Sequence, residues 1–170
     1  MRPALLHGIG WLALLLTGCA GYQLGPTGGL KAGARSVQVN PIVNQTLEPR
    51  LSAAVNHALR KQLQQDGTFR LSTRGEGDII VTGDILRFDR SEVSFQPTDV
   101  LTVRDYGLTI IARIIARERD SGRVLLDRPV LGRATIRAGS DLPSAERQAV
   151  PLLAEDLARN VTSLLVDGSW

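Results

Sequence analysis

The stretch RDYGLTIIARIIARERDSGRVLLDRPVLGRATIR, residues 104–137, decides the fold. Apolar residues alternate through 104–119, which predicts the longest strand of the chain. Asp120-Ser-Gly122 is a turn signal, so residues 124–137 are expected to return as a hairpin partner. Pro129 indicates a bulge or a sheet edge, because proline cannot donate a ladder hydrogen bond. The apolar face of the first strand is formed by Tyr106, Leu108, Ile110, Ala112, Ile114 and Ala116.

A short strand and a helix open the domain upstream of this hairpin. Val37 and Val39 alternate with polar residues, and Pro41 limits that strand or puts it at an edge. The helix is predicted to start near Thr46, a fair N-cap, and to end at Gly67. Pro49 fits its first turn. One apolar stripe at every fourth position is made by Leu47, Leu51, Val55, Leu59 and Leu63.

The rest of the chain adds a strand and a second helix. Residues 78–90 alternate and predict a strand, whereas 91–103 are expected to form a loop. Ser144 can cap the last helix, and Pro151 is expected to kink this helix or mark its true start. Its apolar stripe is made by Ala149, Leu153, Leu157, Val161 and Leu164.

The expected element order is strand, helix, three strands and helix. A strand, a crossover helix and a second strand favour a parallel pair, and the hairpins add antiparallel neighbours. Two one-sided helices need a shared sheet face on which to bury their stripes. We therefore predict an α/β (α+β) fold, a two-layer sandwich with two helices on one face of a four-stranded mixed sheet.

The N-terminal segment predicts export and lipidation. Arg2 gives residues 1–18 a positive start, and the apolar run that follows is shorter than the about 20 residues of a spanning helix. The run ends in LTGC, which resembles the lipobox of bacterial lipoproteins. The resemblance implies cleavage before Cys19 and acylation of this residue, with several acyl chains anchoring firmly. Ala20 replaces the Asp of an inner-membrane retention signal and so favours the outer membrane.

Residues 19–35 are then expected to be a flexible, Gly-rich tether, and residues 36–170 a single domain. The whole chain has 20 Lys and Arg against 17 Asp and Glu, and a pI near 9.6 by itself says little about partners. No nucleic-acid partner is predicted. Since Cys19 is the only cysteine, the domain is expected to fold without disulfides.

Catalytic and metal-binding patterns are missing from the sequence. There is no P-loop, no GxGxxG after a strand and no GxSxG elbow. His57 lies off the apolar stripe and is expected to face solvent, and His7 lies in the predicted signal. Asp78 and Asp84 share a strand face and could do acid–base work, although solvated positions are the more ordinary interpretation. We therefore expect neither an enzyme nor a cofactor or metal.

A binding surface is the remaining functional candidate. A two-layer sandwich leaves one sheet face open, and apolar patches rimmed by charge often mark interaction sites. The ordinary alternative is a solvated amphipathic face. As candidates for a partner or an anionic amphiphile we select Arg90, Arg113, Arg117, Arg133, Arg137, Ile111, Ile115 and Phe88, beside Ile80 and Leu86.

Several segments occur in an order that is informative as a set. They are Cys19–Leu24, Val37–Val39, Asn44–Leu51, Asp78–Ile85, Gly122–Leu126, Gly139–Leu142 and a tryptophan near the end. This set resembles the LptE family of lipopolysaccharide-assembly lipoproteins. The chain departs from the family pattern at Ile42-Val43, where an aromatic residue is expected, and at Pro151.

The resemblance implies a non-enzymatic plug inside the β-barrel of an LptD-like protein at the outer membrane. Such a plug supports barrel assembly and lipopolysaccharide delivery to the outer leaflet. Arg113, Arg117, Arg133 and Arg137 could then meet lipid A phosphates by charge-assisted hydrogen bonds. Whether the lipid is bound directly stays open.

Two other functions are compatible with a lipidated α/β domain. One is a lipoprotein activator of a peptidoglycan synthase, which needs a long tether to cross the periplasm. About 15 residues at roughly 3.3 Å each reach only about 50 Å, which favours a partner close to the membrane. The other is a subunit of a fibre-export channel, which needs spanning hairpins of about 10 residues per strand.

Overall fold

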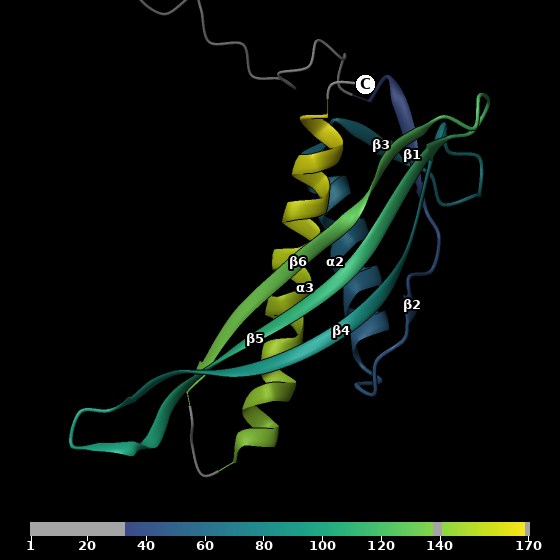
Figure 1. Ribbon diagram of the computed structural model, residues 1–170. Coiled ribbons are helices and arrows are strands. Elements are labelled where there is room, and N and C mark those ends of the chain that lie inside the picture. The colour runs from purple at the N-terminus through teal and green to yellow at the C-terminus, as the bar shows by residue number, and fades with distance from the viewer. Residues whose placement is uncertain (1–32, 138–140, 169–170) are drawn as a thin grey trace, which may run out of the picture.

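The structure, a computed structural model, describes residues 33–137 and 141–168 (Figure 1). The predicted signal 1–18, Cys19 and most of the predicted tether lie outside these residues. The elements, in chain order, are β1 (Arg35–Val39), β2 (Val43–Asn44), α2 (Leu51–Asp66), β3 (Phe69–Leu71), β4 (Ile79–Gln96), β5 (Asp99–Glu118), β6 (Val124–Arg137) and α3 (Leu142–Val166).

The strands form one mixed sheet in the order β3-β1-β4-β5-β6, and β2 also pairs with β4. The predicted parallel pair is confirmed, because β1 and β4 run parallel on either side of the α2 crossover. β4, β5 and β6 are antiparallel neighbours, as the hairpin prediction required. The sheet has six strands and not four, because the short segments β2 and β3 also join the ladder.

The two helices lie side by side on one face of the sheet, which confirms the two-layer arrangement (Figure 1). α3 packs mainly against β6, and α2 packs against α3 and β3. The hydrophobic core lies between the layers. Its largest fully buried side chains are Ile42, Leu51, Leu59, Leu63, Ile79, Ile85, Leu108, Ile110, Ile114, Leu153, Leu157 and Leu165.

α2 begins one turn later than predicted. Its N-cap is Arg50, and Leu47 is fully exposed in the preceding loop, although its spacing matched the apolar stripe. The loop has hydrogen bonds of its own: the Asn44 side chain accepts from the Thr46 backbone and donates to the carbonyl of Glu48 (3.0 and 2.7 Å). The predicted end is confirmed, because Gly67 adopts a left-handed conformation with φ of 74°.

α3, in contrast, begins earlier than predicted. The Asp141 side chain accepts from the backbone N–H of Ser144 at 3.1 Å, so Asp141 and not Ser144 is the N-cap. The helix continues through Pro151, which therefore does not mark its start.

The largest difference from prediction is at residues 91–103. Here β4 and β5 continue as a two-stranded ribbon to Gln96 and Asp99, where a loop was expected. β6 pairs with β5 only as far as Asp105, opposite Arg137, so the ribbon extends beyond the three-stranded part of the sheet. Figure 1 shows the outer end of the ribbon projecting past the helices. We call Arg87–Gln96 with Asp99–Arg104 the arm, of which the inner part, Arg87–Glu92, lies opposite β5 residues that still pair with β6.

Candidate functional site

The open face is the side of β4, β5 and β6 that the helices do not cover. Directly paired residues of neighbouring strands share a face, so the register shows which side chains lie there. On β5 these include Ile111, Arg113, Ile115 and Arg117, and on β6 Arg133 and Arg137 lie opposite Thr109 and Asp105. The structure thus places six of the eight candidate residues on the open face, as predicted.

Phe88 and Arg90 were placed on the wrong face. Ile85 pairs with Ala112 and Arg87 pairs with Ile111, so Leu86 is left without a direct partner in the ladder. A bulge of this kind shifts the alternation of every later residue by one. Arg87 and Asp89 consequently share the open face, opposite Ile111 and Thr109.

Phe88 and Arg90 instead face the helices. Phe88 lies opposite the fully buried Ile110 and lines a cavity of about 280 Å³ between the start of α2 and the start of α3. Arg90 forms an ion pair with Glu146 of α3. Its guanidinium carbon is 5.6 Å from the centre of the Tyr106 ring, which is within cation–π range. Both side chains therefore help to fasten the base of the arm to α3.

Two of the four open-face arginines that were predicted to bind phosphate already have carboxylate partners. Arg113 donates two parallel hydrogen bonds to Asp127, at 2.8 and 2.9 Å. These bonds raise the pKa of Arg113 and lower the pKa of Asp127. The Nε of Arg137 is 3.7 Å from the carboxylate of Asp105. An anion would have to compete with these aspartates for the two arginines.

Arg117 and Arg133 are different. In the part of the chain that the structure describes, neither side chain forms an ion pair within 4 Å. Both are exposed, and Ile111 and Ile115 lie partly buried on the same face. The open face also holds Asp84, Asp89, Asp105 and Asp127, so its charges nearly cancel. The face is a mixed polar surface with two available arginines, and not a strongly cationic patch.

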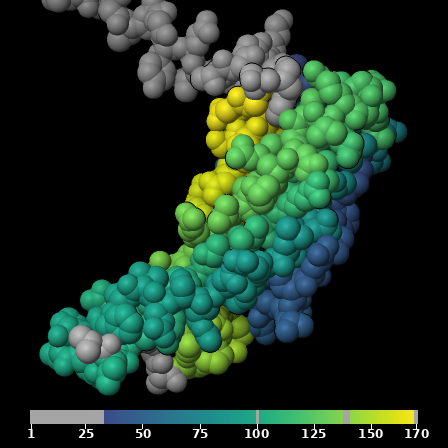
Figure 2. Space-filling view, viewed as in Figure 1, coloured from purple at the N-terminus to yellow at the C-terminus, as the bar shows by residue number. Residues whose placement is uncertain are grey.

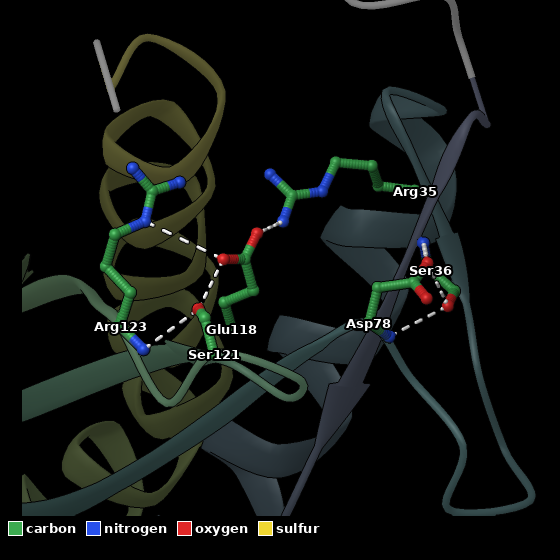
Figure 3. A network of polar contacts seen from close by, with 6 residues as sticks. All are labelled: Arg35, Ser36, Asp78, Glu118, Ser121 and Arg123. Carbon is green, nitrogen blue, oxygen red and sulfur yellow. Dashed lines mark hydrogen bonds and ion pairs between the residues drawn. The ribbon is translucent and has the colours of Figure 1, made fainter.

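A polar network fastens the end of the sheet where the chain enters the domain (Figure 3). Asp78 accepts from the backbone N–H and the hydroxyl of the buried Ser36, at 2.6 and 2.8 Å. These hydrogen bonds lower the pKa of Asp78. Glu118 forms an ion pair with Arg35 and accepts from Ser121, and the Ser121 hydrogen bond is the main reason that its pKa is lowered.

This network gives Asp78 a structural role. A carboxylate that holds two hydrogen bonds and has a lowered pKa is a poor general base near neutral pH. Asp84 lies on the open face opposite Arg113. The arrangement offers no support for the acid–base alternative that the sequence left open. His57 is exposed, which confirms its predicted position.

Within residues 33–137 and 141–168, no group of three or more His, Cys, Asp or Glu residues could hold a metal ion. The helices of these same residues include none that is long and apolar enough to cross a membrane.

Comparison with known proteins settles the family. The family model described as "LptE: Lipopolysaccharide-assembly" matches residues 34–165. The chain belongs to the LptE family. LptE is a family of non-enzymatic lipoproteins, and membership connects this chain to lipopolysaccharide assembly. No curated protein matches the chain in sequence.

Solved structures share the fold at low sequence identity. A hypothetical protein from Chlamydia trachomatis is 11% identical with a TM-score of 0.56, over 79% of this chain and 97% of that one. A Xanthomonas campestris protein is 12% identical with a TM-score of 0.55, over 85% and 88%. A minor lipoprotein from Acinetobacter baumannii is 10% identical with a TM-score of 0.52, over 78% and 93%. At these identities the likeness shows the LptE-like fold alone.

Proposed function

We propose that this protein is an outer-membrane lipoprotein, acylated at Cys19, that lies inside the lumen of an LptD-like β-barrel. There it supports barrel assembly and helps deliver lipopolysaccharide to the outer leaflet. Family membership supports the general role, and the shape of the domain supports the plug.

The length of the sheet is the observation that carries the plug. β5 has 20 residues, which at about 3.3 Å each span about 66 Å. A bilayer with its headgroups is about 40–45 Å thick. The body is elongated along this direction and narrow across it (Figure 2). It is therefore long enough to reach from one membrane surface to the other through a barrel.

The open face also suits a barrel interior. Barrel lumens are lined by polar side chains. A plug is therefore best suited to a lumen when its own surface is polar and its charges are already paired. The Arg113–Asp127 pair meets this condition, because each charge already has its counter-ion, and Asp105 is shared by Arg104 and Arg137. The tether keeps the domain close to the membrane, since about 15 extended residues reach only about 50 Å.

Purification of the full-length lipoprotein from its own membranes in mild detergent tests this proposal. We expect a large outer-membrane barrel to co-purify. The control is Cys19→Ala, which cannot be acylated and should yield less complex from membranes. Recovery of a periplasmic transpeptidase in place of a barrel would overturn the proposal and support the synthase-activator function.

Direct contact with lipopolysaccharide is a second part of the proposal. Because Arg117 and Arg133 have no described ion pair, they should meet lipid A phosphates more readily than Arg113 and Arg137. We expect R117E/R133E to weaken lipopolysaccharide binding by the purified protein more than R113E/R137E does. The two variants change net charge equally, so general electrostatics cannot cause the difference. Equal binding by both variants and the wild type would refute direct contact between these arginines and lipopolysaccharide.

A further inference from the structure

The edge of the sheet at β6 is blocked to further strands over Pro129–Arg133. Leu131 and Arg133 point their backbone groups away from β5, and both are bound by α3. Asn160 donates to the carbonyl of Leu131, and Asp156 accepts from the N–H of Arg133, each at 2.9 Å. Pro129, the preceding outward position, has no N–H to offer. Native proteins block exposed edges by such means to prevent pairing with other chains.

The edge of β4 is open over the arm. β1 and β2 pair with β4 only as far as Ile85, yet β4 continues to Gln96. Phe88, Arg90 and Glu92 lie opposite the β5 residues whose backbone groups bond to β6, so their own backbone groups point outward. Among the described residues, no backbone hydrogen bond from another segment reaches these three positions.

Exposed apolar side chains occur along β4 and on the segment beside it. Val93 and Phe95 lie on the arm, and Leu86 lies at its base. Val43 lies on β2, which pairs with β4, and Leu47 lies in the loop that follows β2. Together these five make up more than half of the nine large apolar side chains that are exposed in the described residues. Apolar side chains on and beside an unpaired strand edge offer surface that the side chains of an added strand can cover.

The arginines of the edge are already paired, and Glu92 adds an exposed carboxylate, so the edge is poorly suited to an anionic ligand. Arg87 and Asp89 pair with each other at 2.7 Å, and Arg90 pairs with Glu146. What the edge offers is a row of outward backbone N–H and C=O groups beside apolar side chains. An extended polypeptide satisfies both, because it supplies matching backbone groups and alternate side chains for the apolar surface.

We propose that the β4 edge of the arm, Phe88–Phe95, binds an extended, uncharged segment of the barrel partner by strand addition. The proposal rests on the proposed function for the identity of that partner. The added strand would continue the line that β2 leaves after Asn44. Pairing of two such short edges between copies of this chain would be only marginally stable, which favours a partner that also contacts the rest of the domain.

Glu92→Pro tests the inference, with Glu92→Ala as the matched control. Both variants remove the same exposed carboxylate, but only proline removes the outward N–H. Pro129 shows that this sheet accepts proline at an outward edge position. Thermal unfolding of each variant checks that the domain stays folded. Full-length wild type and variants are then purified from native membranes in mild detergent, and barrel recovery is measured.

We expect E92P to recover about tenfold less barrel than E92A does. Recovery with E92A should equal recovery with the wild type. In the wild-type complex, hydrogen exchange at the amides of Arg90 and Glu92 should be slower than in the free protein. Normal recovery with E92P and unchanged exchange would overturn strand addition while the plug stands. A wild-type dimer that E92P disrupts would also overturn it, because the occupant would be a second copy. Absence of any barrel with the wild type would overturn both proposals.

Discussion

Replacing Gly132 with alanine tests how closely α3 lies against β6. A Cβ added at Gly132 would be 2.5 Å from the carbonyl oxygen of Leu153, and 2.8 and 2.9 Å from the Cβ and backbone nitrogen of Leu157. These atoms belong to the helix backbone or its first side-chain carbon and cannot rotate away. Overpacking costs about 1–3 kcal/mol, and the rigidity of this contact places G132A near 3 kcal/mol.

Gly107→Ala is the matched control in the neighbouring strand β5. A Cβ there would be 2.9 Å from Cγ2 of Val93 and 3.2 Å from Oγ of Ser91, but both are ends of side chains that can rotate toward solvent. We expect G107A to stay within about 1 kcal/mol of the wild type.

Guanidinium and thermal unfolding measure both variants. For a domain of this size, roughly 2–4 °C is lost per kcal/mol, so G132A should lower Tm by about 6–12 °C and G107A by much less. Equal Tm values for the two variants would refute the claim that the helix backbone leaves no room at Gly132.

Three further perturbations follow from the same structure. The lowered pKa of Asp78 means that its contribution to stability is full near neutral pH and is lost as the pH falls below the ordinary value of 3.8. The stability difference between wild type and D78N should therefore shrink from pH 7 to pH 3 in urea titrations, and a constant difference would contradict this. D156A/N160A should make the protein self-associate in sedimentation experiments, because it reopens the β6 edge; a strictly monomeric variant would show that the two side chains do not protect it. F88A should lower the free energy of unfolding by about 2 kcal/mol, because Phe88 packs beneath the helices. It should leave lipopolysaccharide binding unchanged; weaker binding by F88A would show that Phe88 is part of the open face.

The β5–β6 hairpin and the helix pair could be predicted because each has one strong periodic signal. Ile110, Ala112 and Ile114 alternate without interruption, and Gly122 supplies the turn. The parallel β1–β4 pair followed from a strand, a crossover helix and a second strand. Six open-face candidates were placed correctly for the same reason, since alternation on β5 fixes the faces of its neighbours.

The arm, the start of α2 and the faces of Phe88 and Arg90 could not be predicted in this way. Register shifts interrupt the ladder between Glu92 and Gln96, so the arm has no regular alternation. Leu47 matches the helical spacing by coincidence, because local hydrogen bonds of Asn44 hold its loop outside the helix. Nothing in the local sequence announces the bulge at Leu86, whose effect depends on the partner strand.

The bulge at Leu86 has an evolutionary consequence. Because the extra residue is absorbed within β4, a relative that lacks it would keep the same side chains on each face of the sheet. Insertion or deletion of one residue at this point therefore leaves the core side chains in place. Counting residues from the start of β4, in contrast, would assign the residues after the bulge to the wrong face of the sheet. In proteins that share the fold at about 11% identity, corresponding positions must be matched by sheet face and ladder partner, and not by sequence offset.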